Sequence, residues 1–141
     1  VGRHTEYTDK IERFIKENKL EERVHIISNV PFDDLPAFYQ LAEIFVYPSR
    51  FEGFGIPIIE ALYSDIPVVA ATGSCLEEAG GPDSIYVHPD DIKGMANAFK
   101  QIYSDTERKK EMIEKGQKFA KRFSEEKQAE EILNIYKKLM K

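Results

Sequence analysis

The stretch that decides the fold is Ser49-Arg50-Phe51-Glu52-Gly53-Phe54-Gly55-Ile56-Pro57-Ile58-Ile59-Glu60-Ala61-Leu62. The run before it, Ile44-Phe45-Val46-Tyr47, is β-branched and aromatic and ends at a proline, which is typical of a buried parallel strand. After the two glycines the apolar spacing becomes helical, and Pro57 suits a first helical turn because its missing N–H costs nothing there. The pattern predicts a strand, a glycine turn and a helix N-terminus.

The predicted turn carries two carboxylates, Glu52 and Glu60. A helix N-terminus attracts phosphate through its free N–H groups and its dipole. A carboxylate instead accepts hydrogen bonds from hydroxyls, and it can hold the vicinal diol of a ribose or a hexose. Because helical side chains lean toward the N-terminus, we expect Glu60 to reach the same ligand as Glu52. Charge that complements the helix dipole would explain one glutamate, but the whole Glu-Gly-Phe-Gly turn indicates a nucleotide-sugar site.

Strand and helix patterns alternate until about residue 88, and the rest of the chain has a helical pattern. This order predicts an α/β fold, namely a Rossmann-like parallel sheet flanked by helices with a helical C-terminal segment. Ligands of such sheets bind beyond the carboxyl ends of the strands, where the Glu52 turn is expected. A length of 141 residues with 42% hydrophobic and 32% charged residues predicts one globular domain, residues 1–141.

The Glu52 to Glu60 segment resembles the E-x7-E motif of family 4 retaining glycosyltransferases, which have the GT-B fold, and the resemblance spans nearly the whole chain. Other segments match the family in order. These are Arg23–Val30 as the strand and loop before the nucleobase pocket, Leu35–Ala42 as the short helix after it, Pro67–Ala71 as the next core strand, Val87–Asp91 as the valine-aspartate-proline turn, and Arg122–Ser124 as the start of the closing helix. The resemblance implies the nucleotide-sugar donor domain, the C-terminal half of such an enzyme.

The resemblance also implies roles for the residues of the motif. Glu52 would be the catalytic residue, meeting the hydroxyls of the transferred sugar near the reacting centre. Glu60 would hold the ribose hydroxyls. The backbone N–H groups of Gly53, Phe54 and Gly55 would face the sugar and the diphosphate. The implied reaction is hexosyl transfer from an NDP-sugar to a glycan or lipid-linked acceptor with retention of the anomeric configuration.

Three further residues, Val30, Pro31 and Phe32, would border the base. The resemblance implies an enzyme that needs no metal. It implies no cofactor either, because the NDP-sugar is the donor substrate. Enzymes of this family usually work on the cytoplasmic side. In agreement, the acidic pairs Asp33-Asp34 and Asp90-Asp91 stand at predicted helix starts, where capping is their expected role. We therefore predict no metal ligand in the chain.

The chain opens with Val1-Gly2-Arg3-His4-Thr5-Glu6-Tyr7, which resembles the end of the second strand of the family's donor domain. The first strand, its helix and the acceptor-binding domain would then lie outside the chain. We expect a donor-binding fragment, truncated at its N-terminus, that is inactive alone. Its expected partners are the nucleotide sugar, the N-terminal acceptor domain and, through the parent enzyme, a lipid-linked acceptor or the membrane surface.

Basic residues concentrate in the last third of the chain although the net charge is −5. One interpretation is attraction to an anionic membrane, which would place the parent enzyme in the cytoplasm, peripheral to the inner face of the membrane. The alternative, which we favour, is a solvated helix face. No nucleic-acid partner is expected from the negative balance.

Helical apolar spacing in this region predicts one buried face on each of two helices. The first face comprises Met112, Ile113, Gly116, Phe119, Ala120 and Phe123, and the second comprises Ile132, Leu133, Tyr136 and Met140. In the resembled family the last helix packs toward the other domain. Some of the residues Ile135, Leu139 and Met140 are therefore expected to be exposed in this chain.

Two other functions remain open from the sequence. The chain could be a binding or partner module that kept the fold without the chemistry, or part of a sugar-nucleotide epimerase or hydrolase on the same fold. The minor candidates have ordinary explanations. His4, His25 and His88 lack metal-ligand spacing, and Cys75 has no nearby base that would make it a nucleophile. Phe54 is either a packing residue or a surface on which a base stacks.

Overall fold

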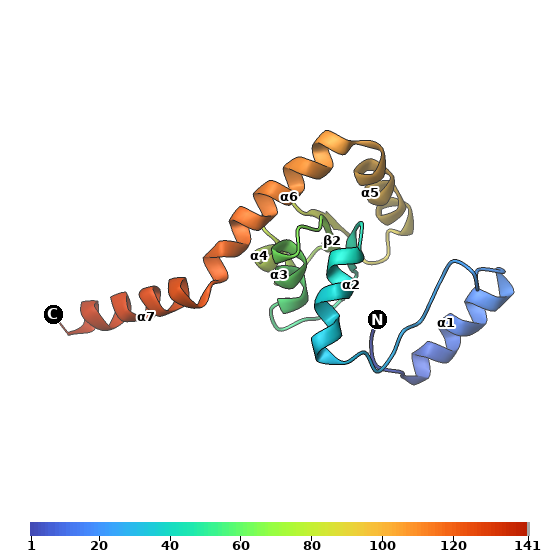
Figure 1. Cartoon of the computed structure of the whole chain (residues 1–141), viewed down its shortest axis with the longest axis horizontal. Coiled ribbons are helices and arrows are strands. Elements are labelled where there is room, and N and C mark those ends of the chain that lie inside the picture. Colours follow the sequence, from blue (N-terminus) through green and yellow to red (C-terminus); the bar gives the residue numbers. More distant parts are fainter. Residues whose placement is uncertain (141) are drawn as a thin grey trace. The chain divides into compact units, whose positions relative to one another are not determined.

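The computed structural model describes residues 1–140, and these form two compact units, residues 1–37 and the residues from Phe38 onward (Figure 1). Unit 1 contains α1 (Glu6–Glu17), the short helix η1 (Phe32–Asp34) and the beginning of α2 (Leu35–Leu41). The Thr5 N–H donates to Thr8 Oγ1 at 2.9 Å just before α1. This bond satisfies one donor at a helix start, where backbone N–H groups otherwise lack partners.

The segment Arg23–Val30, expected to contain a strand, forms none, so this prediction is wrong. Val24, Ile26 and Ile27 are 41%, 39% and 37% exposed. In the described part of the chain the backbone of residues 25–30 makes one hydrogen bond, from the Gly2 N–H to the Ile27 carbonyl at 3.0 Å. A strand needs a row of such bonds to a neighbouring strand, and a single bond leaves the segment extended but unpaired.

The sheet of unit 2 has three parallel strands in the order β1 (Phe45–Tyr47), β2 (Val68–Ala71) and β3 (Ile85–Val87). Tyr47 aligns with Ala70, which in turn aligns with Tyr86. All four residues of β2 are buried, as expected for a strand covered on both faces. The predicted α/β fold is confirmed, and the carboxyl ends of the strands meet at one edge of the sheet.

Helices cover both faces of the sheet in unit 2 (Figure 1). On one face α3 (Ile56–Tyr63) and α4 (Leu76–Gly80) pack their apolar residues against Val68 and Ala70. On the other face α5 (Ile92–Ser104) packs against Val69. The long helix α6 (Thr106–Ala120) contributes to both clusters, and its predicted buried face is confirmed by the burial of Met112 and Ala120.

Local signals place the helix ends as the sequence predicts. Asp91 caps α5 by accepting from the Gly94 N–H at 2.8 Å, and Ser124 caps α7 (Glu125–Leu139) by accepting from the Lys127 N–H at 3.3 Å. A short helix, η2 (Lys121–Phe123), separates α6 from α7. The start of the closing helix at Ser124 is therefore confirmed.

The predicted buried face of α7 is wrong. Ile132, Leu133, Tyr136 and Met140 are 55%, 52%, 61% and 85% exposed, and no residue of α7 is buried. The helix packs against η2 at its beginning, and no described element covers its apolar side. Helical spacing shows which side chains share a face but not whether anything lies against it. The expected exposure of Ile135 and Leu139 is confirmed.

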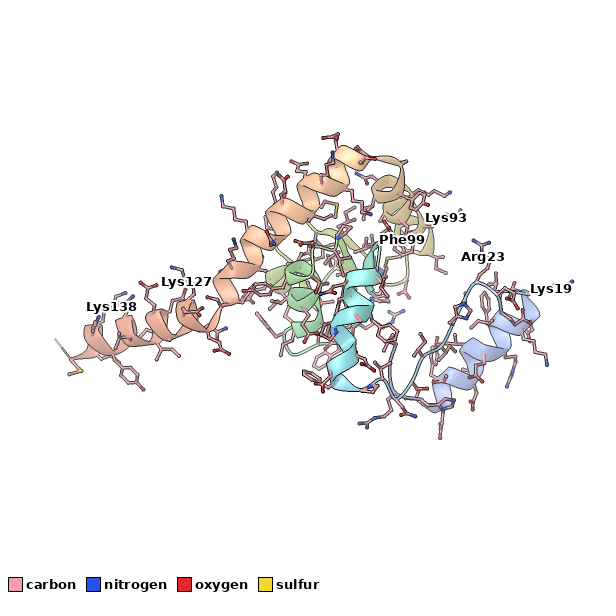
Figure 2. The ribbon with its side chains drawn as sticks, in the orientation of Figure 1. Lys19, Arg23, Lys93, Phe99, Lys127 and Lys138 are labelled. Atoms are coloured by element: carbon pink, nitrogen blue, oxygen red, sulfur yellow. The ribbon has the colours of Figure 1, made fainter. Side chains whose placement is uncertain are left out.

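Charged side chains line α7 as well, and Figure 2 labels Lys127 and Lys138 among them. Lys127 pairs with Glu130 at 3.3 Å, and both side chains are about 60% exposed. Exposed pairs of this kind contribute little to stability, which agrees with a solvated helix face. None of the helices in residues 1–140 combines the length and the apolar character needed to cross a membrane.

Candidate functional site

The Glu52 turn lies at the carboxyl end of β1 and leads into α3, as predicted. Gly55 precedes the helix with a φ of 105°, in the left-handed region that favours glycine. A Cβ at Gly55 would stand 2.9 Å from Leu76 Cδ2 and 3.3 Å from Ala79 Cβ. By contrast, nothing lies within 4 Å of a Cβ built at Gly53. The turn therefore requires glycine at position 55 because of the core behind it.

Each motif glutamate accepts a hydrogen bond from a tyrosine. The Tyr47 hydroxyl donates to Glu52 Oε1 at 2.8 Å, and the Tyr39 hydroxyl donates to Glu60 Oε2 at 2.8 Å. Tyr39 and Tyr47 are both half-buried on the α3 face of the sheet. Burial, followed by the hydrogen bond to Glu52 and its charge, raises the pKa of Tyr47 to about 12. The pKa of Tyr39 is raised further for the same reasons, with Glu60 as its partner.

Two more contacts hold the backbone of the turn. The Cys75 thiol donates to the Glu52 carbonyl at 3.2 Å, which ties the turn to the start of α4. The Phe54 ring meets the Phe123 ring edge-on at 5.5 Å between centroids, and Phe123 packs on Phe119 in the same manner at 5.8 Å. Phe54 is therefore a packing residue, and Cys75 is a partly buried loop residue as expected.

The backbone N–H groups of Gly53, Phe54 and Gly55 donate no hydrogen bond within residues 1–140. They precede the N-terminus of α3, where the helix dipole favours negative charge. Two carboxylates that accept hydroxyl donors and three unused N–H groups thus belong to the Glu52 turn and the helix α3 that follows it. Such a turn can bind a ligand with both hydroxyl and anionic groups.

Charged side chains hold the loops that follow the three strands, both between loops and within one of them. Arg50, in the Glu52 turn, forms an ion pair with Asp90, which follows β3. Its guanidinium holds the pKa of the Asp90 carboxyl below its usual range. After β2, Glu77 accepts from the Thr72 hydroxyl and from the Gly73 N–H. These bonds fix the loops that border the turn.

The residues predicted to border the base lie in unit 1. Pro31 precedes η1, Phe32 begins it and is 79% exposed, and Val30 is half-buried. The structure does not bring them together with Glu52 or Glu60 within one unit. Their role at a base stays a prediction.

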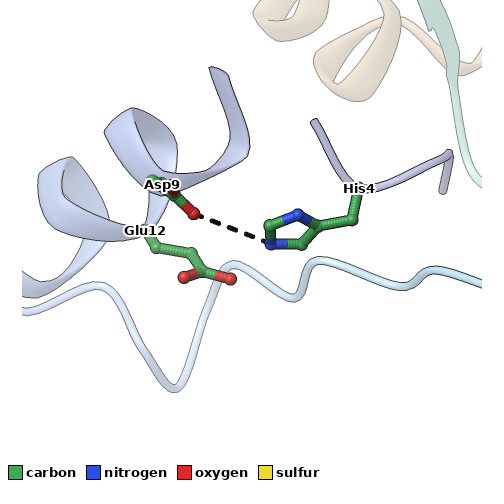
Figure 3. Close-up of side chains that lie close together, drawn as sticks. All are labelled: His4, Asp9 and Glu12. Atoms are coloured by element: carbon green, nitrogen blue, oxygen red, sulfur yellow. Dashed lines mark ion pairs between the residues drawn. The ribbon is translucent and has the colours of Figure 1, made fainter. Parts of the chain in front are cut away.

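One group of side chains in unit 1 has the composition of a metal site. His4 Nε2 lies 3.8 Å from Asp9 Oδ1, and Glu12 stands one turn further along α1 (Figure 3). One ligand atom from each of the three lies within 4.8 Å of the others, and all three residues are exposed. They could gather a divalent cation, but acidic residues in a first helical turn are also explained by the dipole.

Sequence reasoning missed the partners of the motif glutamates. The sequence predicts Tyr47 as the end of a buried strand, and it gives Tyr39 no role at the site. Tyr47 leaves β1 on the same side as Phe45, which faces α3, so strand alternation could have indicated its direction. For Tyr39 no local signal exists, because its contact with Glu60 spans 21 residues.

Comparisons with known proteins agree with this geometry. The model of the family described as glycosyl transferases group 1 matches residues 1–119. The chain is 32% identical over 131 residues to O-antigen chain mannosyltransferase B of Escherichia coli, covering 93% of this chain and 34% of that protein. It is 34% identical over 130 residues to D-inositol 3-phosphate glycosyltransferase of Corynebacterium aurimucosum, covering 91% and 31%. The chain thus spans about a third of the length of these relatives.

Solved structures share the fold. Sucrose-phosphate synthase from Thermosynechococcus elongatus superposes with a TM-score of 0.81 at 27% identity, covering 94% of this chain and 34% of that chain. Anabaena HepE, solved with UDP and glucose, superposes with a TM-score of 0.86 at 22% identity, covering 97% and 39%. The family match, which covers most of the chain, and these neighbours lead to one conclusion. This chain belongs to the glycosyl transferases group 1 family.

Proposed function

We propose that this chain is the donor-binding part of a retaining hexosyltransferase, which moves a hexosyl group from an NDP-sugar to a glycan or lipid-linked acceptor. The observation that carries the proposal is the Glu52 turn with the helix α3 that follows it: together they hold two tyrosine-bonded glutamates and three unused N–H groups after a strand of a parallel sheet. The named relatives are mannosyl- and glycosyltransferases, which supports the reaction class.

In the proposed mechanism the turn acts mainly through electrostatics. The Glu52 carboxylate accepts hydrogen bonds from hydroxyls of the transferred sugar as positive charge develops at its anomeric carbon. The N–H groups of Gly53 to Gly55 and the dipole of α3 stabilise the diphosphate as it leaves. Glu60 holds the ribose hydroxyls. No side chain is assigned as a nucleophile, and transfer is proposed to proceed without a metal ion.

The proposal extends to the setting of the reaction. We propose that the enzyme works in the cytoplasm at the inner face of the membrane, where a lipid-linked acceptor and the NDP-sugar meet. This part of the proposal rests on the class of acceptor, because the excess of Lys and Arg near the end of the chain is assigned to a solvated helix face. An acceptor-binding domain outside this chain would complete the site.

The test is a transfer assay with the full-length gene product, UDP-glucose, GDP-mannose or ADP-glucose, and a lipid extract as acceptor source. Glu52→Ala is expected to lower the transfer rate by at least 100-fold, the size of effect seen when one electrostatic contact to a transition state is removed. The product keeps the anomeric configuration of the donor. Unchanged transfer in this variant would contradict the proposal. Epimerised or freely hydrolysed sugar without an acceptor would replace it by an epimerase or hydrolase.

A further inference from the structure

The two motif glutamates share one structural feature, which is a tyrosine hydroxyl on one carboxylate oxygen. The bonds from Tyr47 to Glu52 Oε1 and from Tyr39 to Glu60 Oε2 are both 2.8 Å long. A carboxylate accepts about four hydrogen bonds, so each glutamate keeps its second oxygen and further lone pairs for a ligand. The tyrosines therefore orient the carboxylates without using up their capacity.

The tyrosines themselves are fixed by the sheet. Tyr47 belongs to β1, and its ring stacks on Phe45 with centroids 5.8 Å apart. The ring of Tyr39, on α2, also packs against Phe45, with centroids 5.5 Å apart. A tyrosine has only two side-chain torsions, and these rings are half-buried. The direction of each carboxylate is thus set by packed rings rather than by the exposed loop.

Fixing a glutamate in advance matters for binding. A free glutamate side chain loses rotamer entropy when a ligand immobilises it, and a bond made before the ligand arrives removes that cost. The hydroxyls are protonated at neutral pH, as in any tyrosine, and so act as donors; burial raises the pKa of both further above that range. Each tyrosine acts on a different glutamate, so the two are separable by experiment.

We propose that Tyr47 and Tyr39 are positioning residues of the donor site, Tyr47 orienting Glu52 toward the transferred sugar and Tyr39 orienting Glu60 toward the ribose. The inference rests on the proposed function, since it assigns the two glutamates to different parts of the donor. It predicts that the loss of each hydroxyl weakens a different part of the donor's binding.

The test measures dissociation constants of the full-length gene product by calorimetry with UDP, GDP and ADP and with UDP-glucose, GDP-mannose and ADP-glucose. Tyr47→Phe raises the dissociation constant of the nucleotide sugar about 5- to 10-fold, the size expected for the loss of one hydrogen bond to a charged group. The dissociation constant of the free nucleotide changes by less than about 2-fold. Tyr39→Phe weakens the binding of the nucleotide sugar and of the free nucleotide, each by about 5- to 10-fold. Tyr86→Phe is the matched control, because its hydroxyl donates to the Gly81 carbonyl at 2.7 Å and to neither glutamate.

A double-mutant cycle separates positioning from a general structural role. If Tyr47 acts through Glu52, the pair Tyr47→Phe with Glu52→Ala binds the nucleotide sugar no more weakly than Glu52→Ala alone, because alanine leaves the hydroxyl no acceptor at position 52. Additive losses, or equal losses for nucleotide and nucleotide sugar in Tyr47→Phe, overturn the inference. Unchanged binding in both tyrosine variants also overturns it while leaving the proposed function intact. Wild-type protein that binds none of the six compounds overturns the proposed function and the inference with it.

Discussion

Gly55→Ala should destabilise the chain strongly because of the way the Glu52 turn is built. The residue has a φ of 105°, where a residue with a Cβ is strained by about 1–3 kcal/mol. Its new methyl group would also stand 2.9 Å from Leu76 Cδ2. Leu76 is fully buried, so it has little room to move, and overpacking of this kind costs about 1–3 kcal/mol. Replacing glycine stiffens the unfolded chain and recovers about 0.4–1 kcal/mol.

The expected net loss for Gly55→Ala is therefore about 1–5 kcal/mol of unfolding free energy, with a central value of about 3 kcal/mol. The measurement is urea unfolding followed by circular dichroism at 222 nm, because the chain has no tryptophan to report by fluorescence. Gly53→Ala is the matched control, since a Cβ there meets nothing within 4 Å and its φ is not positive. We expect the control to stay within about 0.5 kcal/mol of the wild type. Equal losses in the two variants would refute the assignment of the strain to Gly55.

Three further outcomes are expected. Because the pKa of Tyr47 is raised to about 12, the stability linked to it is complete below the ordinary value of 10.0 and is lost as the pH rises toward 12. Glu52→Gln lowers that pKa, as followed by carbon NMR of labelled tyrosine rings. Asp91→Ala removes the cap of α5 and lowers the unfolding free energy by about 1 kcal/mol in the same urea assay. Phe123→Ala removes the edge-on partner of Phe54, and amide NMR signals of the turn from residue 53 to 55 shift as a result.

Each of these outcomes has a contradicting result. An unchanged Tyr47 titration in Glu52→Gln would mean that burial alone sets its pKa. For α5, Asp90→Ala is the comparison, because this exposed residue pairs with Arg50 and does not cap the helix, so its loss should destabilise the chain less than Asp91→Ala does. Equal losses in the two variants would contradict the assignment of the cap to Asp91. If Phe123→Ala changed signals only in α6 and α7, the ring contact would not hold the turn.

Much of unit 2 could be predicted because its signals are local. The strand before Pro48, the helix start near Pro57 and the cap at Ser124 follow from side-chain chemistry within a few residues. Asp65, just after α3, adopts a φ of 59°, and Asp tolerates that conformation better than most residues.

The errors and omissions arose where a contact lies far away along the chain. The segment from Arg23 to Val30 has the apolar content of a strand. It could form one only by hydrogen bonding to a neighbouring strand, and its own residues do not show whether such a strand is present. The apolar side of α7 looked buried because spacing alone cannot show what covers a face. The hydrogen bond from Tyr39 to Glu60 joins two helices, and the sequence of neither helix predicts it.

The most direct test of the donor site is a two-dimensional NMR titration of this chain with UDP, GDP, ADP and their sugar conjugates. The account predicts shifts that cluster at residues 53–60 with one of the bases and that disappear in Glu60→Ala. Shifts that cluster elsewhere, or that persist unchanged in Glu60→Ala, would contradict the assignment of this turn as the nucleotide-sugar site.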